Sequence, residues 1–265
     1  MTYSYAWKEV FNPGDAKDFF QAANLHPFVV DASEFNRANG WLLSELSRLI
    51  YVKGDNAIDL EHQTEIRNGY LHKIGLIEKW FYNGEHVQCA IITTMACRDK
   101  SFSVLVFRGT QGRVANWVFN LATALSPWPS GGNVHRGFKM LLMEAWGAIE
   151  PQLSNLAGPV YYTGHSLGGA LAVLAASLKK PAAVYTFGSP RIGNSAFVNA
   201  TKHIDMYRVV NPRDIVACVP PIPGVMHVGE PHCLTNTSNA SAQRCWFEAP
   251  GFLADHSPSN YTVQL

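Results

Sequence analysis

Residues 161–177 read YYTGHSLGGALAVLAAS, and this stretch decides the fold. Strand-forming residues precede Ser166, and an Ala- and Leu-rich segment with high helical propensity follows it. The pentapeptide GHSLG (164–168) is a G-x-S-x-G motif, in which glycines let a strand and a helix approach closely while the serine projects from the turn. The alternative is that Ser166 only caps the helix. We interpret Ser166 as a nucleophile, because the motif lies between a predicted strand and a predicted helix.

The composition indicates one large domain with a substantial core. The chain has 265 residues, of which 47% are hydrophobic and only 15% are charged. The formal net charge is +1 and no basic run is present, so the charge pattern does not favour a nucleic acid as partner. No linker-like stretch divides the chain, and we predict a single domain over residues 1–265.

Membrane and redox signals are weak in this sequence. The apolar stretch 170–176 is too short to cross a bilayer, so we expect no transmembrane segment. The first ten residues, MTYSYAWKEV, lack the pattern of a secretory signal, which leaves an intracellular location, another export route or a removed leader as alternatives. The five cysteines have no metal-ligand spacing, and Cys233 and Cys245 are a candidate disulfide pair. We expect no metal and no organic cofactor.

Hydrophobic periodicity predicts a helical first third, with helices over 15–23, 34–51 and 60–71. Short β-rich segments begin near residue 75. Strands and helices then alternate, which indicates parallel strands joined by crossover helices. The later elements are expected as strands at 76–82, 87–95 and 101–109, a helix at 138–152, a strand at 160–163, a helix after Ser166, a strand at 183–187, a helix at 195–202 and a strand at 206–210.

A serine nucleophile needs a basic histidine and a carboxylate that orients it. Functional groups of an open parallel sheet gather at the carboxyl ends of its strands. Asp205 precedes the predicted strand 206–210, whereas Asp214 follows it. We therefore predict Asp214 as the orienting acid and Asp205 as a capping or solvated residue at the other end. The other downstream acids are Glu230, Glu248 and Asp255.

Several histidines compete for the role of base. His227 lies in the strand-like VMHVGE and is interpreted as a packed residue, and His232 lies in a polar loop. His256 lies in the late loop ADHSPSNY, from which an imidazole can reach the sheet edge. The residues alone favour His256 but leave the others open. His165 is interpreted as structural, because its side chain must point away from its neighbour Ser166.

Stabilisation of an oxyanion needs two hydrogen-bond donors. The backbone N–H of Leu167, directly after the nucleophile, is the first expected donor. The second is expected after another central strand, where SVLVFRGTQG offers Thr110 with both an N–H and a hydroxyl. The alternative for Thr110 is an ordinary turn at the strand end.

Six segments occur in the order seen in the class 3 lipases, the fungal-type triacylglycerol lipase family. They are VFRGT, VHRGF, TGHSLGGALA, YTFGSPRIGN, YRVVNPRDIVACVPP and DHS, between residues 101 and 256. This resemblance implies an α/β-hydrolase fold, with a central, mostly parallel sheet flanked by helices and a short helical lid. It also implies the catalytic residues Ser166, Asp214 and His256 and the oxyanion donors Thr110 and Leu167. One departure is SPSNY after the histidine, where family members often have an aromatic pair.

An apolar face at helical spacing marks a candidate lid over residues 112–132. Trp117, Val118 and Leu121 lie on this face, between Gly112 and the segment PWPSGG as candidate hinges. The alternative is a helix of the core. The resemblance favours a lid whose apolar face meets the substrate or a lipid surface.

These features predict a serine-dependent carboxylic ester hydrolase, with triacylglycerols at a lipid–water interface as the favoured substrate. Phospholipase A1 and feruloyl or other carboxyl esterases share the fold and the triad and are the alternatives. An alternative of another class is a non-catalytic lipid-binding protein, which the complete set of reactive residues disfavours. The resemblance implies secretion, although this chain shows no signal peptide.

Overall fold

The structure, a computed structural model, describes residues 3–52, 59–95, 100–109, 124–235 and 249–265. The strands of its main sheet are β1 (Leu76–Asn83), β2 (Gln88–Thr94), β3 (Ser103–Phe107), β6 (Val160–His165), β7 (Ala183–Phe187), β8 (Met206–Val210) and β9 (Glu230–Cys233). These strands follow one another across the sheet in chain order. The first two pairings are antiparallel, and the four pairings from β3 to β9 are parallel. The carboxyl ends of five neighbouring strands therefore meet at one edge.

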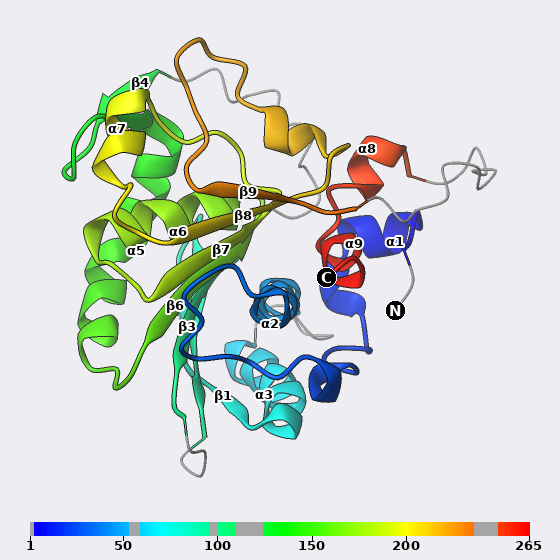
Figure 1. Ribbon diagram of the computed structural model, residues 1–265. Helices are drawn as coiled ribbons and strands as arrows, with labels where there is room; N and C mark the ends of the chain where they lie inside the picture. The colour runs from blue at the N-terminus through cyan, green and yellow to red at the C-terminus, as the bar shows by residue number, and fades with distance from the viewer. Residues whose placement is uncertain (1–2, 53–58, 96–99, 110–123, 236–248) are drawn as a thin grey trace.

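Helices cover both faces of this sheet, as Figure 1 shows. The helices are α1 (Trp7–Phe11), α2 (Arg37–Leu49), α3 (Leu60–Leu71), α5 (Arg136–Ser154), α6 (Leu167–Leu178), α7 (Ser195–Ala200), α8 (Gly251–Ala254) and α9 (Pro258–Val263). The helices α5 and α6 pack on one face, whereas α2, α3 and α9 lie on the other. Each face has its own hydrophobic cluster. The predicted α/β architecture is confirmed.

The central helix α6 is apolar all round because it is enclosed on every side. Its residues from Leu167 to Ala176 are all buried, between the sheet and α5. The strand β6 leads into this helix within one residue, so the two elements approach closely. A Cβ on Gly164 would lie 2.3 Å from the carbonyl carbon of Gly168, and a Cβ on Gly168 would lie 2.2 Å from the carbonyl oxygen of Phe107. Both glycines are therefore required by this packing.

Most of the elements expected from periodicity are present. The helices predicted over 34–51 and 60–71 are α2 and α3, and each begins at an N-cap side chain that accepts a backbone N–H. The helix predicted over 15–23 is wrong: two 3-10 turns, Pro13–Asp15 and Ala23–Leu25, occupy this region. The left-handed backbone of Phe20, with φ 60°, interrupts any helix there, and both Phe19 and Phe20 are buried in the core.

The predicted lid is described only at its far end. Residues 110–123, including Thr110, Trp117, Val118 and Leu121, lie outside the described residues. Beyond them, β4 (Leu125–Pro127) pairs with β5 (Asn133–His135) in a separate two-stranded sheet. Trp128 between these strands is buried, and its indole Nε1–H donates to Ser177 Oγ at 2.7 Å. The end of the predicted lid is therefore anchored on α6.

The first residues of the described chain lie beside its last helix (Figure 1). The backbone N–H of Ser4 donates to Asn260 Oδ1 at 2.8 Å, and Asn260 Nδ2 donates to Ser4 O at 2.7 Å. Asn260 Nδ2 also donates to the carbonyl of Ala254 at 2.8 Å, across the loop that carries His256. The N-terminal segment thus fastens this loop from outside. Within the described ranges, no helix is long and apolar enough to cross a membrane.

Candidate active site

Ser166 occupies the turn between β6 and α6 in a strained conformation. Its φ is 58° and its ψ is −127°, and among the described non-glycine residues only Phe20 shares a positive φ. Such a conformation costs about 1–3 kcal/mol and persists only where the surroundings hold it. A hydrogen bond of 2.9 Å from the Ser166 N–H to Phe187 O provides part of that support. A strained strand-to-helix turn of this kind projects the serine hydroxyl out of the turn, as a nucleophile requires.

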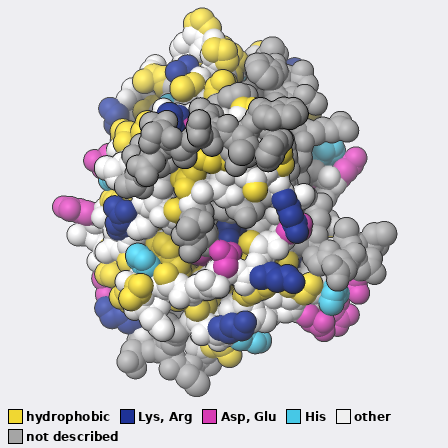
Figure 2. Space-filling model, turned by 90° about the vertical axis from the view of Figure 1, so that its right-hand side faces the viewer, with side chains coloured by type: hydrophobic (Ala, Val, Ile, Leu, Met, Phe, Trp, Pro, Cys, Tyr) yellow, Lys and Arg dark blue, Asp and Glu magenta, His cyan; other side chains and the backbone are white. Residues whose placement is uncertain are grey.

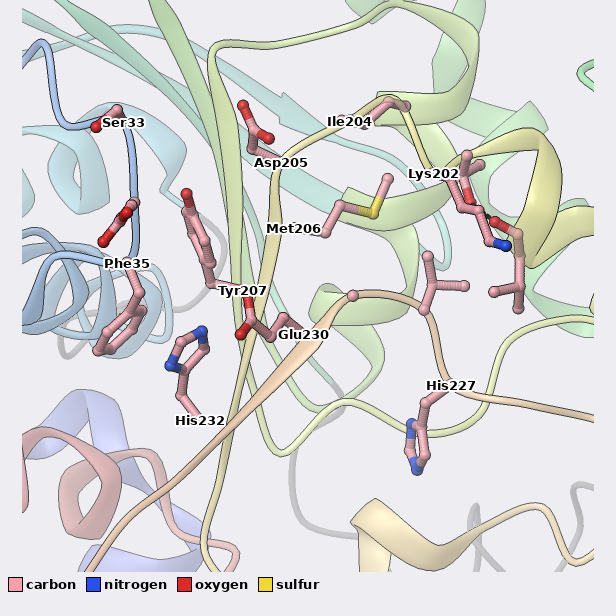
Figure 3. Close-up of a pocket in the computed structure, with 15 residues that line it drawn as sticks. Ser33, Phe35, Lys202, Ile204, Asp205, Met206, Tyr207, His227, Glu230 and His232 are labelled. Atoms are coloured by element: carbon pink, nitrogen blue, oxygen red, sulfur yellow. Dashed lines mark hydrogen bonds between the residues drawn. The ribbon is translucent and has the colours of Figure 1, made fainter.

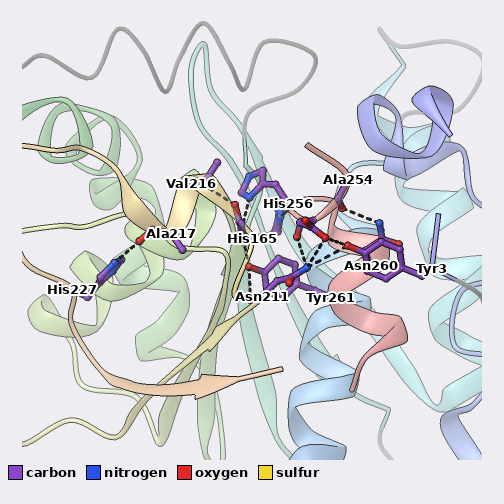
Figure 4. Close-up of polar contacts among 12 residues, drawn as sticks. Tyr3, His165, Asn211, Val216, Ala217, His227, Ala254, His256, Asn260 and Tyr261 are labelled. Carbon is purple, nitrogen blue, oxygen red and sulfur yellow. Dashed lines mark hydrogen bonds and ion pairs between the residues drawn. The ribbon is translucent and has the colours of Figure 1, made fainter. Parts of the chain in front are cut away.

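Asp214 and His256 are hydrogen-bonded to each other, and Figure 4 shows His256 beside His165, the residue before Ser166. The distance from His256 Nδ1 to Asp214 Oδ2 is 2.8 Å, and both side chains are buried. Because an ionised carboxylate only accepts hydrogen bonds, this contact places a proton on Nδ1 and leaves Nε2 as the basic atom. Gly188, with φ 58°, leaves room for the pair, since a Cβ there would lie 2.6 Å from Asp214 Oδ2. The structure thus brings together the acid and the histidine that the sequence favoured.

The Asp214 carboxylate is oriented by two further donors. Its Oδ1 accepts the N–H of Val216 at 2.8 Å, at the start of a short 3-10 helix (Ile215–Cys218). Its Oδ2 also accepts the hydroxyl of Tyr261 at 2.6 Å. Burial, followed by the neighbouring Asp214 charge, raises the pKa of Tyr261 well above its ordinary value, so this hydroxyl stays a donor. The sequence analysis missed Tyr261, although it is the one aromatic residue in the SPSNY segment after the histidine.

Within the described part of the chain, the two reactive atoms form no competing hydrogen bond. Ser166 Oγ and His256 Nε2 are both buried and have no hydrogen-bond partner among the described residues. A buried polar atom without a hydrogen-bond partner is unfavourable. Two such atoms at one site therefore indicate that they take part in a reaction. Hydrogen bonds between nucleophile and base are often long before substrate binds. The two atoms are those that a serine–histidine pair uses.

The structure describes one of the two predicted hydrogen-bond donors to the oxyanion, Leu167. Leu167 is the first residue of α6, and N–H groups in the first turn of a helix lack an acceptor within the helix. Thr110, the other predicted donor, lies outside the described residues. The chain can be followed to Gly109, where an added Cβ would lie 3.3 Å from Ser166 Cβ and 2.6 Å from His165 O. The residue before Thr110 therefore lies against the turn that carries Ser166.

Asp205, the acid that the sequence did not favour, lies at the opposite end of β8 from Asp214. A cavity of about 880 Å³ extends along the outer strands, and Asp205, Glu230 and His232 are among its lining residues (Figure 3). The His232 ring stacks on Phe35 with centroids 3.9 Å apart. Asp205 directly precedes β8, so the length of that strand separates it from Asp214. The prediction that Asp205 lies at the wrong end is confirmed.

Two other residues that the sequence offered as base or acid, His227 and Asp255, form contacts with other partners. His227 Nε2 donates to Ala217 O at 2.6 Å, and burial, aided by Arg208, lowers its pKa to about 4. Asp255, next to the base in sequence, is buried and forms an ion pair with Arg213 at 3.2 Å.

Among the described residues, no group of three His, Cys, Asp or Glu side chains could hold a metal ion. Cys233 lies exposed at the end of β9, and Cys245 lies outside the described residues.

The parallel sheet and the serine at its central strand-to-helix turn define an α/β-hydrolase fold. Residues 104–224 match the model of the family described as Lipase (class 3). This match covers a little under half of the chain and agrees with the resemblance that the six motifs indicated.

Individual relatives named as lipases also match the chain in part. A lipase of Rhizomucor miehei is 34% identical over 164 residues, which cover 53% of this chain and 44% of the relative. The secreted mono- and diacylglycerol lipase 1 of Fusarium solani is 38% identical over 126 residues, or 41% of this chain and 37% of the relative. The chain therefore spans less than half the length of these curated relatives. A solved fungal lipase–inhibitor complex, described as a model for interfacial activation, has 26% identity and a TM-score of 0.54 over 73% of this chain and 84% of its own.

Exchange of Asp214 for asparagine should separate the two candidate acids. Asp214→Asn removes the charge that holds the Nδ1–H tautomer of His256, and we expect kcat for ester hydrolysis to fall about 10⁴-fold. Asp205→Asn is the matched control, because Asp205 is exposed at the other end of the strand. Its kcat should stay near the wild-type value. Steady-state kinetics on a dissolved ester measure both, and reversed effects would reject the assignment of Asp214.

Tyr261→Phe should remove one hydrogen bond that orients the Asp214 carboxylate, without removing the charge of that carboxylate. A hydrogen bond to a charged group contributes about 1.5–3 kcal/mol, so we expect kcat to fall about 10- to 100-fold. Tyr162→Phe is the control, since Tyr162 is equally buried but lies in the core cluster on the α5 and α6 side. Equal kcat values for the two variants would show that Tyr261 only fills space.

Proposed function

We propose that this protein hydrolyses carboxylic esters, with triacylglycerols as the preferred substrate, through an acyl-serine intermediate. The observation that carries the proposal is the strained Ser166 beside the bonded pair of His256 and Asp214, with Oγ and Nε2 both buried and unsatisfied. The match of residues 104–224 to the family model and the relatives named as lipases support the same chemistry. The relative from Fusarium solani, named for mono- and diacylglycerols, favours partial glycerides as a second substrate class to be assayed.

The geometry supports the following sequence of bond changes. His256 Nε2 takes the proton of Ser166 as Oγ attacks the ester carbonyl carbon, and the carbonyl oxygen becomes an oxyanion. The backbone N–H of Leu167, with Thr110 as the second proposed donor, stabilises that charge. The bond from carbon to the alcohol oxygen then breaks, and His256 returns its proton to the leaving alcohol. Water, deprotonated by His256, cleaves the acyl-serine in the same way and restores Ser166.

We further propose that the chain forms a single domain and that residues 112–132 contain a lid over Ser166. The support is the apolar face of Trp117, Val118 and Leu121 in the sequence. Since β4 is paired and Trp128 is buried, the movable part is proposed to end before Leu125. On the face that Figure 2 shows, charged side chains of both signs are scattered among neutral ones, so adsorption to lipid is proposed to rest on apolar contacts.

Ser166→Ala removes the nucleophile and tests the proposed reaction directly. We expect kcat to fall on the order of 10⁶-fold, because the remaining triad residues act only through Oγ. Hydrolysis of triolein, diolein, phosphatidylcholine and methyl ferulate by the wild type should be fastest on the acylglycerols. The circular dichroism spectrum of the variant serves as the control for folding. Retention of most hydrolysis by a folded Ser166→Ala protein would reject the proposal.

Trp117→Ser tests whether the proposed lid senses a lipid surface. Exposing large apolar side chains to water costs roughly 1.5–3 kcal/mol each, a cost that a lipid surface removes. Activity of the wild type should therefore rise sharply as a partly soluble ester passes its solubility limit, and Trp117→Ser should flatten that rise while sparing hydrolysis of a short dissolved ester.

The matched control for the lid is Met140→Ser, which removes an apolar side chain that is 63% exposed on α5. This variant should keep the rise at the solubility limit. A wild-type rate without a break at that limit, or a Trp117→Ser variant that loses both activities equally, would contradict the lid.

A further inference from the structure

The histidine next to the nucleophile makes a contact that the reaction scheme above does not use. His165 is 3% exposed, and its Nε2 lies 2.6 Å from the backbone carbonyl oxygen of His256. The two imidazole rings lie 4.5 Å apart, at an angle of 38°. The turn that carries Ser166 is therefore bonded directly to the backbone of the proposed base. The labelled side chains in Figure 4 show the two rings side by side.

The protonation state of His165 follows from its partners. A carbonyl oxygen only accepts hydrogen bonds, so Nε2 must carry a proton. Burial, and next the proximity of His256, lowers the pKa of His165 well below its ordinary value, so the ring is neutral and Nδ1 is an acceptor. Tyr51 Oη lies 3.3 Å from this Nδ1 and supplies the donor. Each nitrogen of the His165 ring thus has a fixed role, Nε2 as a donor and Nδ1 as an acceptor.

The same chain of contacts continues to the oxyanion side. The hydroxyl oxygen of Tyr51, on the turn after α2, hydrogen-bonds the backbone amide of Gly109. Tyr51 is fully buried, and an added Cβ on Gly109 would lie only 2.3 Å from its hydroxyl. Gly109 is the last described residue before Thr110. Contacts therefore run without a break from Gly109 through Tyr51 and His165 to His256.

We infer that His165 and Tyr51 are positioning residues, which hold the backbone of the base and the start of the oxyanion loop in register with Ser166. This inference rests on the proposed ester hydrolysis. His165 donates a hydrogen bond to the carbonyl of His256 and accepts one from Tyr51. It therefore links these two residues across the turn that carries Ser166. Tyr51 reaches the same turn from a different layer of the fold. Neither residue touches the substrate in this scheme.

The expected consequence is a loss in the chemical step and not in binding. Displacement of a reacting group by about 1 Å costs about 100-fold in rate. Loss of the Tyr51 hydroxyl removes the donor to His165 Nδ1 and the acceptor of the Gly109 amide, and so loosens both neighbours of Ser166. The ester itself meets none of these atoms. We therefore expect a lower kcat at nearly constant KM.

Tyr51→Phe is the first test, assayed on a short dissolved ester with active sites counted by complete labelling with a fluorophosphonate. We expect kcat per labelled site to fall at least about 10-fold, with KM within about twofold of the wild-type value. Tyr185→Phe is the matched control. Tyr185 is equally buried, its hydroxyl accepts the backbone N–H of Asn36 at 3.1 Å, and its ring packs against Phe35 and Tyr207. This control should lose thermal stability similarly but keep its kcat.

Two substitutions of His165 test the direction of its hydrogen bond. Glutamine carries an N–H donor about as far from the backbone as Nε2 of histidine, whereas methionine has similar length without a donor. His165→Gln should therefore retain more kcat per labelled site than His165→Met. Equal losses in these two variants would show that only the volume of the side chain matters. If neither variant folds, the comparison of Tyr51→Phe with Tyr185→Phe decides.

The outcomes separate this inference from the proposed function. A wild-type protein that neither hydrolyses esters nor reacts with the fluorophosphonate would overturn the proposed function. An active wild type with unchanged kcat in Tyr51→Phe would overturn the positioning role alone. Equal loss of kcat in Tyr51→Phe and Tyr185→Phe would also overturn it, because the effect would then be general destabilisation.

Discussion

The left-handed backbone of Ser166 is the constraint on which the rest of the site depends. A non-glycine residue with φ 58° is unfavourable by about 1–3 kcal/mol, so the packing around it must hold it in place. That packing is the approach of β6 to α6, which Gly164 and Gly168 permit within distances that no side chain could occupy. The Ser166 hydroxyl at this turn is buried and has no hydrogen-bond partner among the described residues.

The sequence predicted the parts of this arrangement that depend on local pattern. The G-x-S-x-G motif, the alternation of strands and helices and the place of Asp214 after a strand are all local features, and the structure contains them. The helix expected over 15–23 failed because two neighbouring phenylalanines, Phe19 and Phe20, both enter the core, which helical periodicity does not describe. Tertiary packing overrode local propensity at that point.

The contacts that orient the triad could not be predicted, because they join segments far apart in the chain. Tyr261 reaches Asp214 across 47 positions, and His165 reaches the His256 carbonyl across 91. Asn260 fastens the same loop to Ser4 at the other end of the chain. None of these pairs has a sequence spacing that indicates a contact. Three separate contacts therefore hold the loop that carries His256. The residues that form them, Tyr261, His165 and Asn260, could from their types alone be ordinary core or helix-surface residues.

The structure of the protein after reaction with an alkylphosphonate ester tests the central claim most directly. The account predicts one covalent bond, from phosphorus to Ser166 Oγ. It also predicts that the phosphonyl oxygen accepts the Leu167 N–H, and that His256 Nε2 lies within hydrogen-bond distance of an oxygen on phosphorus while Nδ1 stays on Asp214. Phosphorus bonded to another side chain, or a phosphonyl oxygen directed away from Leu167, would contradict the account.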